Sequence, residues 1–154
     1  MSKRSLHRLS HVSAAAIVLA LAGQALALES EDIIKYRQAV MKSQAGHMGA
    51  LAQIVRGKVD FKADMSYHAQ ALAASMKTVI GLFPDGSDFG VTSALPSVWE
   101  KRAGFETSAR DAEAAADEFL KAVESGDEAA IGAKFMAVSD SCKACHKDFR
   151  EEKE

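Results

Sequence analysis

Length, composition and charge set the first limits on this chain of 154 residues. Its 19 basic and 21 acidic residues give a formal net charge of −2, and 48% of the residues are hydrophobic. A chain of this size suits one domain with a single core. The slightly acidic balance excludes the basic face that nucleic-acid binding requires.

The N-terminal segment has the pattern of a secretory signal. The first eleven residues contain Lys3, Arg4 and Arg8 but no acidic residue, and an apolar run follows from Val12 to Ala22. This run is shorter than the roughly 20 residues that span a bilayer. The small-x-small pattern at residues 25–27 is typical of a signal-peptidase site, so we prefer a cleaved signal over a permanent anchor.

We therefore expect residues 1–27 to be a signal peptide and residues 28–154 to be one exported domain. This domain keeps 16 basic and 21 acidic residues, a net charge of −5. No later apolar stretch is long enough to cross a membrane. We expect no membrane span after cleavage.

Four apolar stripes with helical spacing run through the expected mature chain, with almost no strand pattern. Their members recur in steps of three and four residues, as on one face of a helix. The stripes are Ile34, Arg37, Met41, Gln44, Met48, Leu51, Val55; Met65, Ala69, Leu72, Met76, Val79, Phe83; Val98, Phe105, Ala109, Ala112, Ala116, Phe119, Val123; and Ile131, Phe135, Val138, Cys142, Cys145, Phe149. Such narrow stripes are stable only when packed together, so we predict an all-α fold, an antiparallel four-helix bundle.

The connections agree with this arrangement. The segments around residues 60 and 126 are short, as neighbouring antiparallel helices need, and Gly126 stands where a helix-ending glycine belongs. The middle connection is longer, running from Pro84 to Pro96, and contains both prolines of the chain.

The chemistry concentrates in the sequence Cys142-Lys-Ala-Cys145-His146, which holds both cysteines of the chain. The pattern C-x-x-C-H in an exported protein indicates covalent attachment of haem c. Residues i, i+3 and i+4 share one helix face, so two thiols can meet two vinyl groups while the imidazole approaches the iron. We predict one covalent haem at the C-terminal end of the bundle.

Three alternatives explain this motif less well. A disulfide between residues three apart closes a very small loop and constrains little of the unfolded chain. A thioredoxin-like pair would accompany a βαβ pattern, which is absent. A zinc site needs four ligands, and only His47 and His68 remain beyond the motif in residues 28–154.

The chain resembles the cytochrome c′ family, the class II c-type cytochromes, over essentially all of residues 28–154. The resemblance rests on separated motifs in order: KYRQAVM followed by HMGALAQIVRG, LFPDGS at 82–87, ALPSVWEK at 94–101 and SCKACHKDFR at 141–150. It implies a left-handed antiparallel four-helix bundle, a periplasmic location and frequent homodimers. It also implies roles in electron transfer or in binding nitric oxide and carbon monoxide.

The resemblance also implies roles for individual residues. Cys142 and Cys145 match the thioether positions, and His146 matches the proximal iron ligand. Two further matches, Arg37 and Gln38, correspond to the family's pair at the haem edge and propionates. The remaining matches are Arg150, the basic residue beside the proximal histidine, and Ser93, a polar residue near the haem edge.

Other polar residues on the helices leave alternatives open. Arg37 lies on an apolar stripe, where an unpaired guanidinium is costly to bury. A haem propionate would satisfy it; otherwise it extends to solvent or to a carboxylate. Gln44 is a similar residue with no assigned partner. We expect His47 and His68 at the surface or rim rather than as ligands, and Trp99 in the core.

The distal side of the iron decides between two functions. Only eight residues follow His146, so a sixth ligand must come from upstream, and Met41, one turn after Arg37, is the best candidate. The first hypothesis is a periplasmic electron carrier that serves a redox partner protein. The second is a five-coordinate sensor or sink for nitric oxide or carbon monoxide, in which Met41 only shields the iron. We predict no enzyme, because no catalytic constellation emerges and His146 is committed to iron.

Overall fold

The computed structural model describes the backbone of residues 7–152 and the side chains of residues 29–152. The predicted signal segment, residues 1–27, lies outside the part whose side chains are described, and its cleavage stays a prediction. None of the helices in the described part is both long and apolar enough to cross a membrane.

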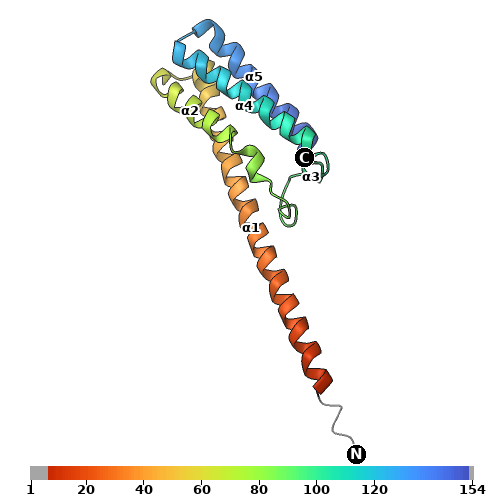
Figure 1. The fold of residues 1–154 in the computed structure, drawn as a ribbon. Helices are drawn as coiled ribbons and strands as arrows, with labels where there is room; N and C mark the ends of the chain where they lie inside the picture. Colours follow the sequence, from red (N-terminus) through yellow and green to blue (C-terminus); the bar gives the residue numbers. More distant parts are fainter. Residues whose placement is uncertain (1–6, 153–154) are drawn as a thin grey trace, which may run out of the picture.

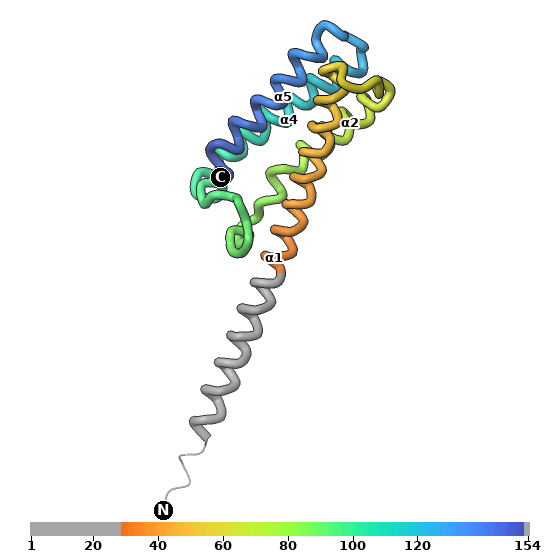
Figure 2. The backbone as a smooth tube through the Cα atoms, turned by 180° about the vertical axis from the view of Figure 1, so that it is seen from behind, coloured from red at the N-terminus to blue at the C-terminus, as the bar shows by residue number. Residues whose placement is uncertain are grey.

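Four long helices form the bundle, and shorter turns connect them (Figure 1). The order is α1 (His7–Val55), the 3₁₀ turn η1 (Lys62–Asp64), α2 (Met65–Met76), the 3₁₀ turn η2 (Val79–Leu82), α3 (Ser97–Glu100), α4 (Arg102–Ser125) and α5 (Glu128–Phe149). Successive long helices run up and down, as Figure 2 shows from behind. The predicted all-α antiparallel four-helix bundle is confirmed.

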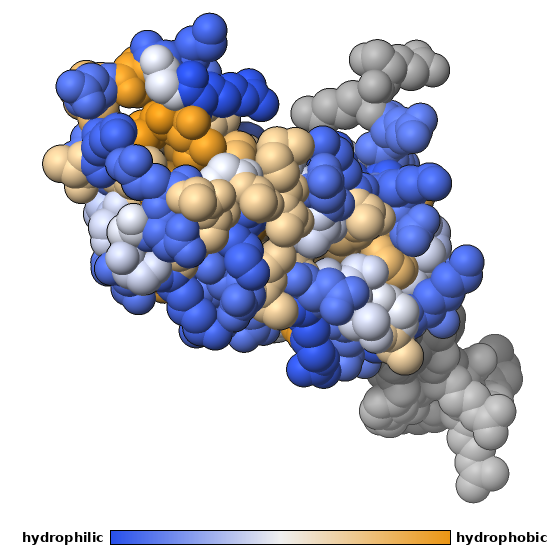
Figure 3. Space-filling model, turned by 90° about the horizontal axis from the view of Figure 1, so that it is seen from above, coloured by the Kyte–Doolittle hydropathy of each residue, from blue (hydrophilic) through white to orange (hydrophobic). Residues whose placement is uncertain are grey.

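The four apolar stripes meet in one core. Its fully buried side chains include Leu51 of α1, Leu72 of α2, Phe105 and Phe119 of α4, and Val138 of α5. Most helix contacts are between α4 and α5, between α2 and α4, and between α1 and α2, whereas α1 and α5 touch at few places. Seen from above, hydrophilic side chains surround an apolar area on the surface (Figure 3).

The turn between α4 and α5 forms as the sequence predicts. Gly126 ends α4 with a φ of 67°, a left-handed conformation that costs glycine little. Asp127 caps α5 by accepting a hydrogen bond from the backbone N–H of Ala130. This tight turn places α5 antiparallel against α4 and so positions the motif near its far end.

Two predicted helices are shorter than their apolar stripes. The second stripe continues to Phe83, but α2 ends at Met76, where Ser75 and Thr78 donate side-chain hydrogen bonds to carbonyls three residues earlier. Such bonds favour tighter turns, and the 3₁₀ turn η2 follows. The third stripe is broken at Lys101, whose φ of −112° and ψ of 43° separate the one-turn helix α3 from α4.

Candidate haem site

The attachment motif lies on the last turns of α5. Cys142, Cys145 and His146 are all half-buried, and both cysteines pack against the apolar core. Both thiols are free rather than joined in a disulfide. The predicted common face of the motif is thus present, turned toward the interior of the bundle.

Burial sets the protonation of these three groups. It raises the pKa of the Cys142 thiol, and it is the main cause that raises the pKa of Cys145 to about 11, with Cys142 and Asp148 adding to the effect. It also lowers the pKa of His146, and the positive charge of Arg150 lowers it further. At neutral pH the site therefore offers two neutral thiols and an imidazole with a free lone pair, the form that binds iron.

The connecting segment between α2 and α3, residues 77–96, includes η2 and returns to the end of α5, where it brings two predicted site residues together. Ala94 and Arg150 form an antiparallel bridge. The backbone N–H of Glu151 donates to the carbonyl of Ser93 at 2.9 Å, and the N–H of Leu95 donates to the carbonyl of Phe149 at 3.1 Å. Ser93 and Arg150 thus both lie at the end of α5, although they are 57 residues apart in the sequence, and the N–H of Arg150 donates to the His146 carbonyl at 3.0 Å.

Arg37 is buried, with 3% of its surface exposed, so its predicted alternative of reaching solvent is wrong. Its Nη1 atom donates to the Leu82 carbonyl at 3.3 Å and to the Ser87 hydroxyl at 3.1 Å. Its Nη2 atom donates to the Ser87 carbonyl at 3.1 Å and to the Thr92 hydroxyl at 3.0 Å. The guanidinium carbon also lies 4.5 Å from the centre of the Phe83 ring.

These bonds engage the four terminal N–H groups of the guanidinium, which has five N–H donors in all. Only the N–H at Nε remains available for another acceptor. A haem propionate would therefore bind Nε of Arg37 or replace one of the contacts to the connecting segment. Pairing of Arg37 with a propionate stays a prediction.

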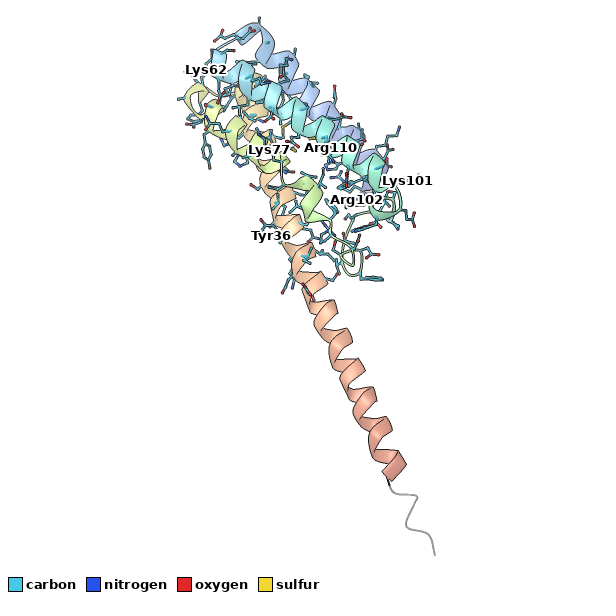
Figure 4. The ribbon with its side chains drawn as sticks, in the orientation of Figure 1. Tyr36, Lys62, Lys77, Lys101, Arg102 and Arg110 are labelled. Carbon is cyan, nitrogen blue, oxygen red and sulfur yellow. The ribbon has the colours of Figure 1, made fainter. Side chains whose placement is uncertain are left out.

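A second arginine holds the same segment from the opposite side. Arg102, at the start of α4, donates to the carbonyls of Phe83 at 2.8 Å and Ile80 at 3.2 Å, and its Nε lies 3.0 Å from Oε1 of Glu106. Figure 4 shows Arg102 beside this segment, whereas Tyr36 of α1 lies on the outside of the bundle. The segment is thus hydrogen-bonded to both α1 and α4.

Gln38 and Met41 occupy different surroundings on α1. The amide of Gln38 is half-buried and donates to the Val91 carbonyl at 2.9 Å, so it too contacts the connecting segment. Met41 is half-buried and packs against the apolar core. That position suits either of its predicted roles, as an iron ligand or as a shield.

Sequence reasoning missed several polar partners. Ser87 and Thr92, which bind Arg37, gave no signal because they are about 50 residues away from it in the chain. His47 and His68 were expected at the surface or rim rather than as ligands, and both are half-buried; the contact between their Nδ1 atoms at 3.0 Å was not predicted. In residues 29–152 no group of three or more potential metal-ligating side chains is found.

Three observations fit a covalent haem between α1 and α5. The two helices facing each other across the bundle make few direct contacts. The motif presents free thiols and a neutral imidazole toward the core. Gln44 of α1 is only 7% exposed, and its buried amide nitrogen has no hydrogen-bond partner.

Comparison with known proteins gives the same result. Residues 32–150 match the family model described as Cytochrome C'. A cytochrome c′ from Pararhodospirillum photometricum is 35% identical over 122 residues, which cover 79% of this chain and 98% of that protein. The crystal structure of cytochrome c′ from Rubrivivax gelatinosus is 33% identical and has a TM-score of 0.75, covering 79% of this chain and 97% of that one. The nitric oxide complex of a leucine-to-alanine variant of the Alcaligenes xylosoxidans protein is 28% identical, with a TM-score of 0.75 over 80% of this chain and 97% of that one.

A helical bundle whose last helix carries C-x-x-C-H defines a class of protein, the helical c-type cytochromes. Within this class, the chain belongs to the cytochrome c′ family. Members of this family bind haem c, and Cys142, Cys145 and His146 are the residues of this chain that suit its attachment and ligation.

Proposed function

We propose that this protein binds nitric oxide or carbon monoxide on the distal side of a five-coordinate haem whose proximal ligand is His146. The haem supplies an iron centre that accepts a sixth, diatomic ligand. The chain positions it by two thioether links and one imidazole. We further propose that the protein works in the periplasm, as its signal-like N-terminus indicates, and that it is not an enzyme.

The observation that carries this proposal is the composition of the buried face of α1. In residues 29–152 the two histidines outside the motif, His47 and His68, contact each other through their Nδ1 atoms at 3.0 Å. They lie beside the turn that joins α1 to α2, where Lys62 contacts Glu128 at the start of α5, whereas His146 lies on the last turns of that helix. We therefore do not assign either histidine to the iron. Met41 is the remaining candidate for the sixth position, and it packs as an apolar side chain against the core. An apolar side chain at this position admits small neutral molecules and excludes larger polar ones.

The nitric oxide complex of the related Alcaligenes protein supports this proposal, because that protein has the same fold and 28% sequence identity. A second candidate, electron transfer to a redox partner protein, is favoured by the thioether of Met41. A methionine ligand together with histidine is the arrangement of many electron-carrying cytochromes.

The absorption spectrum of the holoprotein separates the two candidates. We expect a high-spin ferric spectrum at neutral pH and a ferrous protein that binds carbon monoxide and nitric oxide to saturation. A low-spin spectrum in both oxidation states, without gas binding, would establish the electron carrier instead and overturn the gas-binding proposal.

A further inference from the structure

Gln44 is a buried polar residue of α1 to which the fold gives no partner. Its Nε2 atom is shielded from solvent and makes no hydrogen bond, the one such side-chain nitrogen or oxygen found in residues 29–152. A buried donor without an acceptor is costly, and native structures contain few of them. An unpaired amide in the core therefore calls for an acceptor that the polypeptide does not supply.

The other polar side chains on this part of α1 already have acceptors. Ser30 donates to the Phe89 carbonyl at 3.0 Å, and Gln38 donates to the Val91 carbonyl at 2.9 Å. The terminal N–H groups of Arg37 are engaged by the same connecting segment. Gln44 lies beyond the reach of that segment, two turns after Arg37.

Helix geometry places the Gln44 amide beside Met41. The two residues are three positions apart and lie on one face of α1. Side chains of a helix lean toward its N-terminus, so the Gln44 side chain covers the turn on which Met41 stands. Met41 is the residue of α1 predicted to lie on the distal side of the haem, and α1 makes few direct contacts with α5, the helix that carries the attachment motif.

We propose that Gln44 is the distal hydrogen-bond donor, and that its amide N–H binds the outer atom of a diatomic ligand on the iron. This inference rests on the proposed gas-binding function and deepens it by naming the residue that stabilises the ligand. Nitric oxide and carbon monoxide both carry a lone pair on that outer atom, and a neutral donor in a dry site stabilises it without adding a charge. Gln44 then makes the pocket selective for diatomic ligands over apolar guests of the same size.

The test compares Gln44→Leu with the wild-type holoprotein. Leucine keeps a core side chain of similar size but has no donor. We expect the variant to lose bound carbon monoxide about two- to twelve-fold faster, as the loss of one neutral hydrogen bond predicts. We also expect the C–O stretching frequency of its carbon monoxide complex to rise, because a donor at the outer atom lowers it. Gln53→Leu is the matched control, since Gln53 lies on the same helix but is exposed.

The outcomes separate the two proposals. Wild-type protein that binds neither gas overturns the proposed function and this inference with it. Wild-type protein that binds carbon monoxide with the same stretching frequency and dissociation rate as Gln44→Leu overturns the role of Gln44 alone; its amide then binds only a buried water. Should the leucine variant fail to incorporate haem, Gln44→Ala, which cannot introduce a clash, allows the same two measurements.

Discussion

The buried contacts of Arg37 give the most specific prediction about stability. Replacing Arg37 with leucine removes four hydrogen bonds to Leu82, Ser87 and Thr92 and the contact with the Phe83 ring. Hydrogen bonds to a charged group contribute about 1.5–3 kcal/mol each. They do not add fully here, because the two hydroxyls can turn to water once the segment loosens.

Each buried acceptor left without its donor costs about 1–3 kcal/mol, and we expect Arg37→Leu to lower the free energy of unfolding of the holoprotein by about 3–5 kcal/mol in all. For a domain of this size the corresponding drop in Tm is roughly 10–20 °C. The free energy of unfolding of Arg37→Lys should lie between those of the wild type and Arg37→Leu, because lysine keeps the charge but has three donors instead of five.

Urea unfolding followed by haem absorbance gives the stability, and hydrogen exchange by mass spectrometry gives the local effect. We expect faster exchange in residues 82–92 and little change at the turn around Gly126. Arg110→Leu is the control: Arg110 is exposed and contacts only Glu106 of its own helix, so its loss should leave both measurements near the wild-type values. A stability loss for Arg37→Leu no larger than that of Arg110→Leu would refute the assignment of Arg37 as the anchor of this segment.

Three further outcomes are expected. Cys142→Ser or Cys145→Ser should leave one thioether or block maturation, whereas the wild-type haem should survive acid-acetone extraction; a wild-type mass equal to that of the polypeptide alone would contradict covalent attachment. Met41→Ala should keep the ferric spectrum high-spin and speed carbon monoxide binding, and a conversion from low-spin to high-spin would instead make Met41 a ligand. Burial, and then the charge of His68, lower the pKa of His47 below its ordinary value of about 6.5. Below about pH 6.5 the folded protein then binds fewer protons than the unfolded chain. The contribution of neutral His47 to the free energy of unfolding is therefore complete above about pH 6.5 and is lost as the pH falls toward the lowered pKa. Urea unfolding at pH 7 and at pH 5 should show a smaller loss of stability with falling pH in His47→Asn than in the wild type. An equal loss in both proteins would contradict this role of His47.

The apolar stripes and the attachment motif could be predicted from the sequence because they depend on spacing alone. Steps of three and four residues identify one helix face wherever they occur, and Leu72, Phe119 and Val138 are buried as this rule predicts. Gly126 was readable for the same local reason, since a left-handed helix end favours glycine. The C-x-x-C-H motif likewise carries its chemistry within five residues.

The bounds of α2 and the break at Lys101 could not be predicted from the sequence. Local side-chain hydrogen bonds and tertiary contacts decide where a helix ends, even when its apolar stripe continues. The 3₁₀ turn η2 keeps Val79 and Leu82 buried even though the α-helix has ended. A period near three is common to both kinds of helix, so the sequence pattern does not distinguish them.

By itself, the sequence determined the helical class and the core faces, and it predicted the residues that attach and ligate the haem. Only the tertiary structure decided which polar side chains on α1 have partners. Arg37 and Gln44 look alike in the sequence, as polar residues on one apolar stripe. The connecting segment engages Arg37 through residues about 50 positions away, while Gln44 keeps a buried donor without an acceptor. Hydrogen bonding over such separations depends on how the chain folds back, which no local pattern encodes.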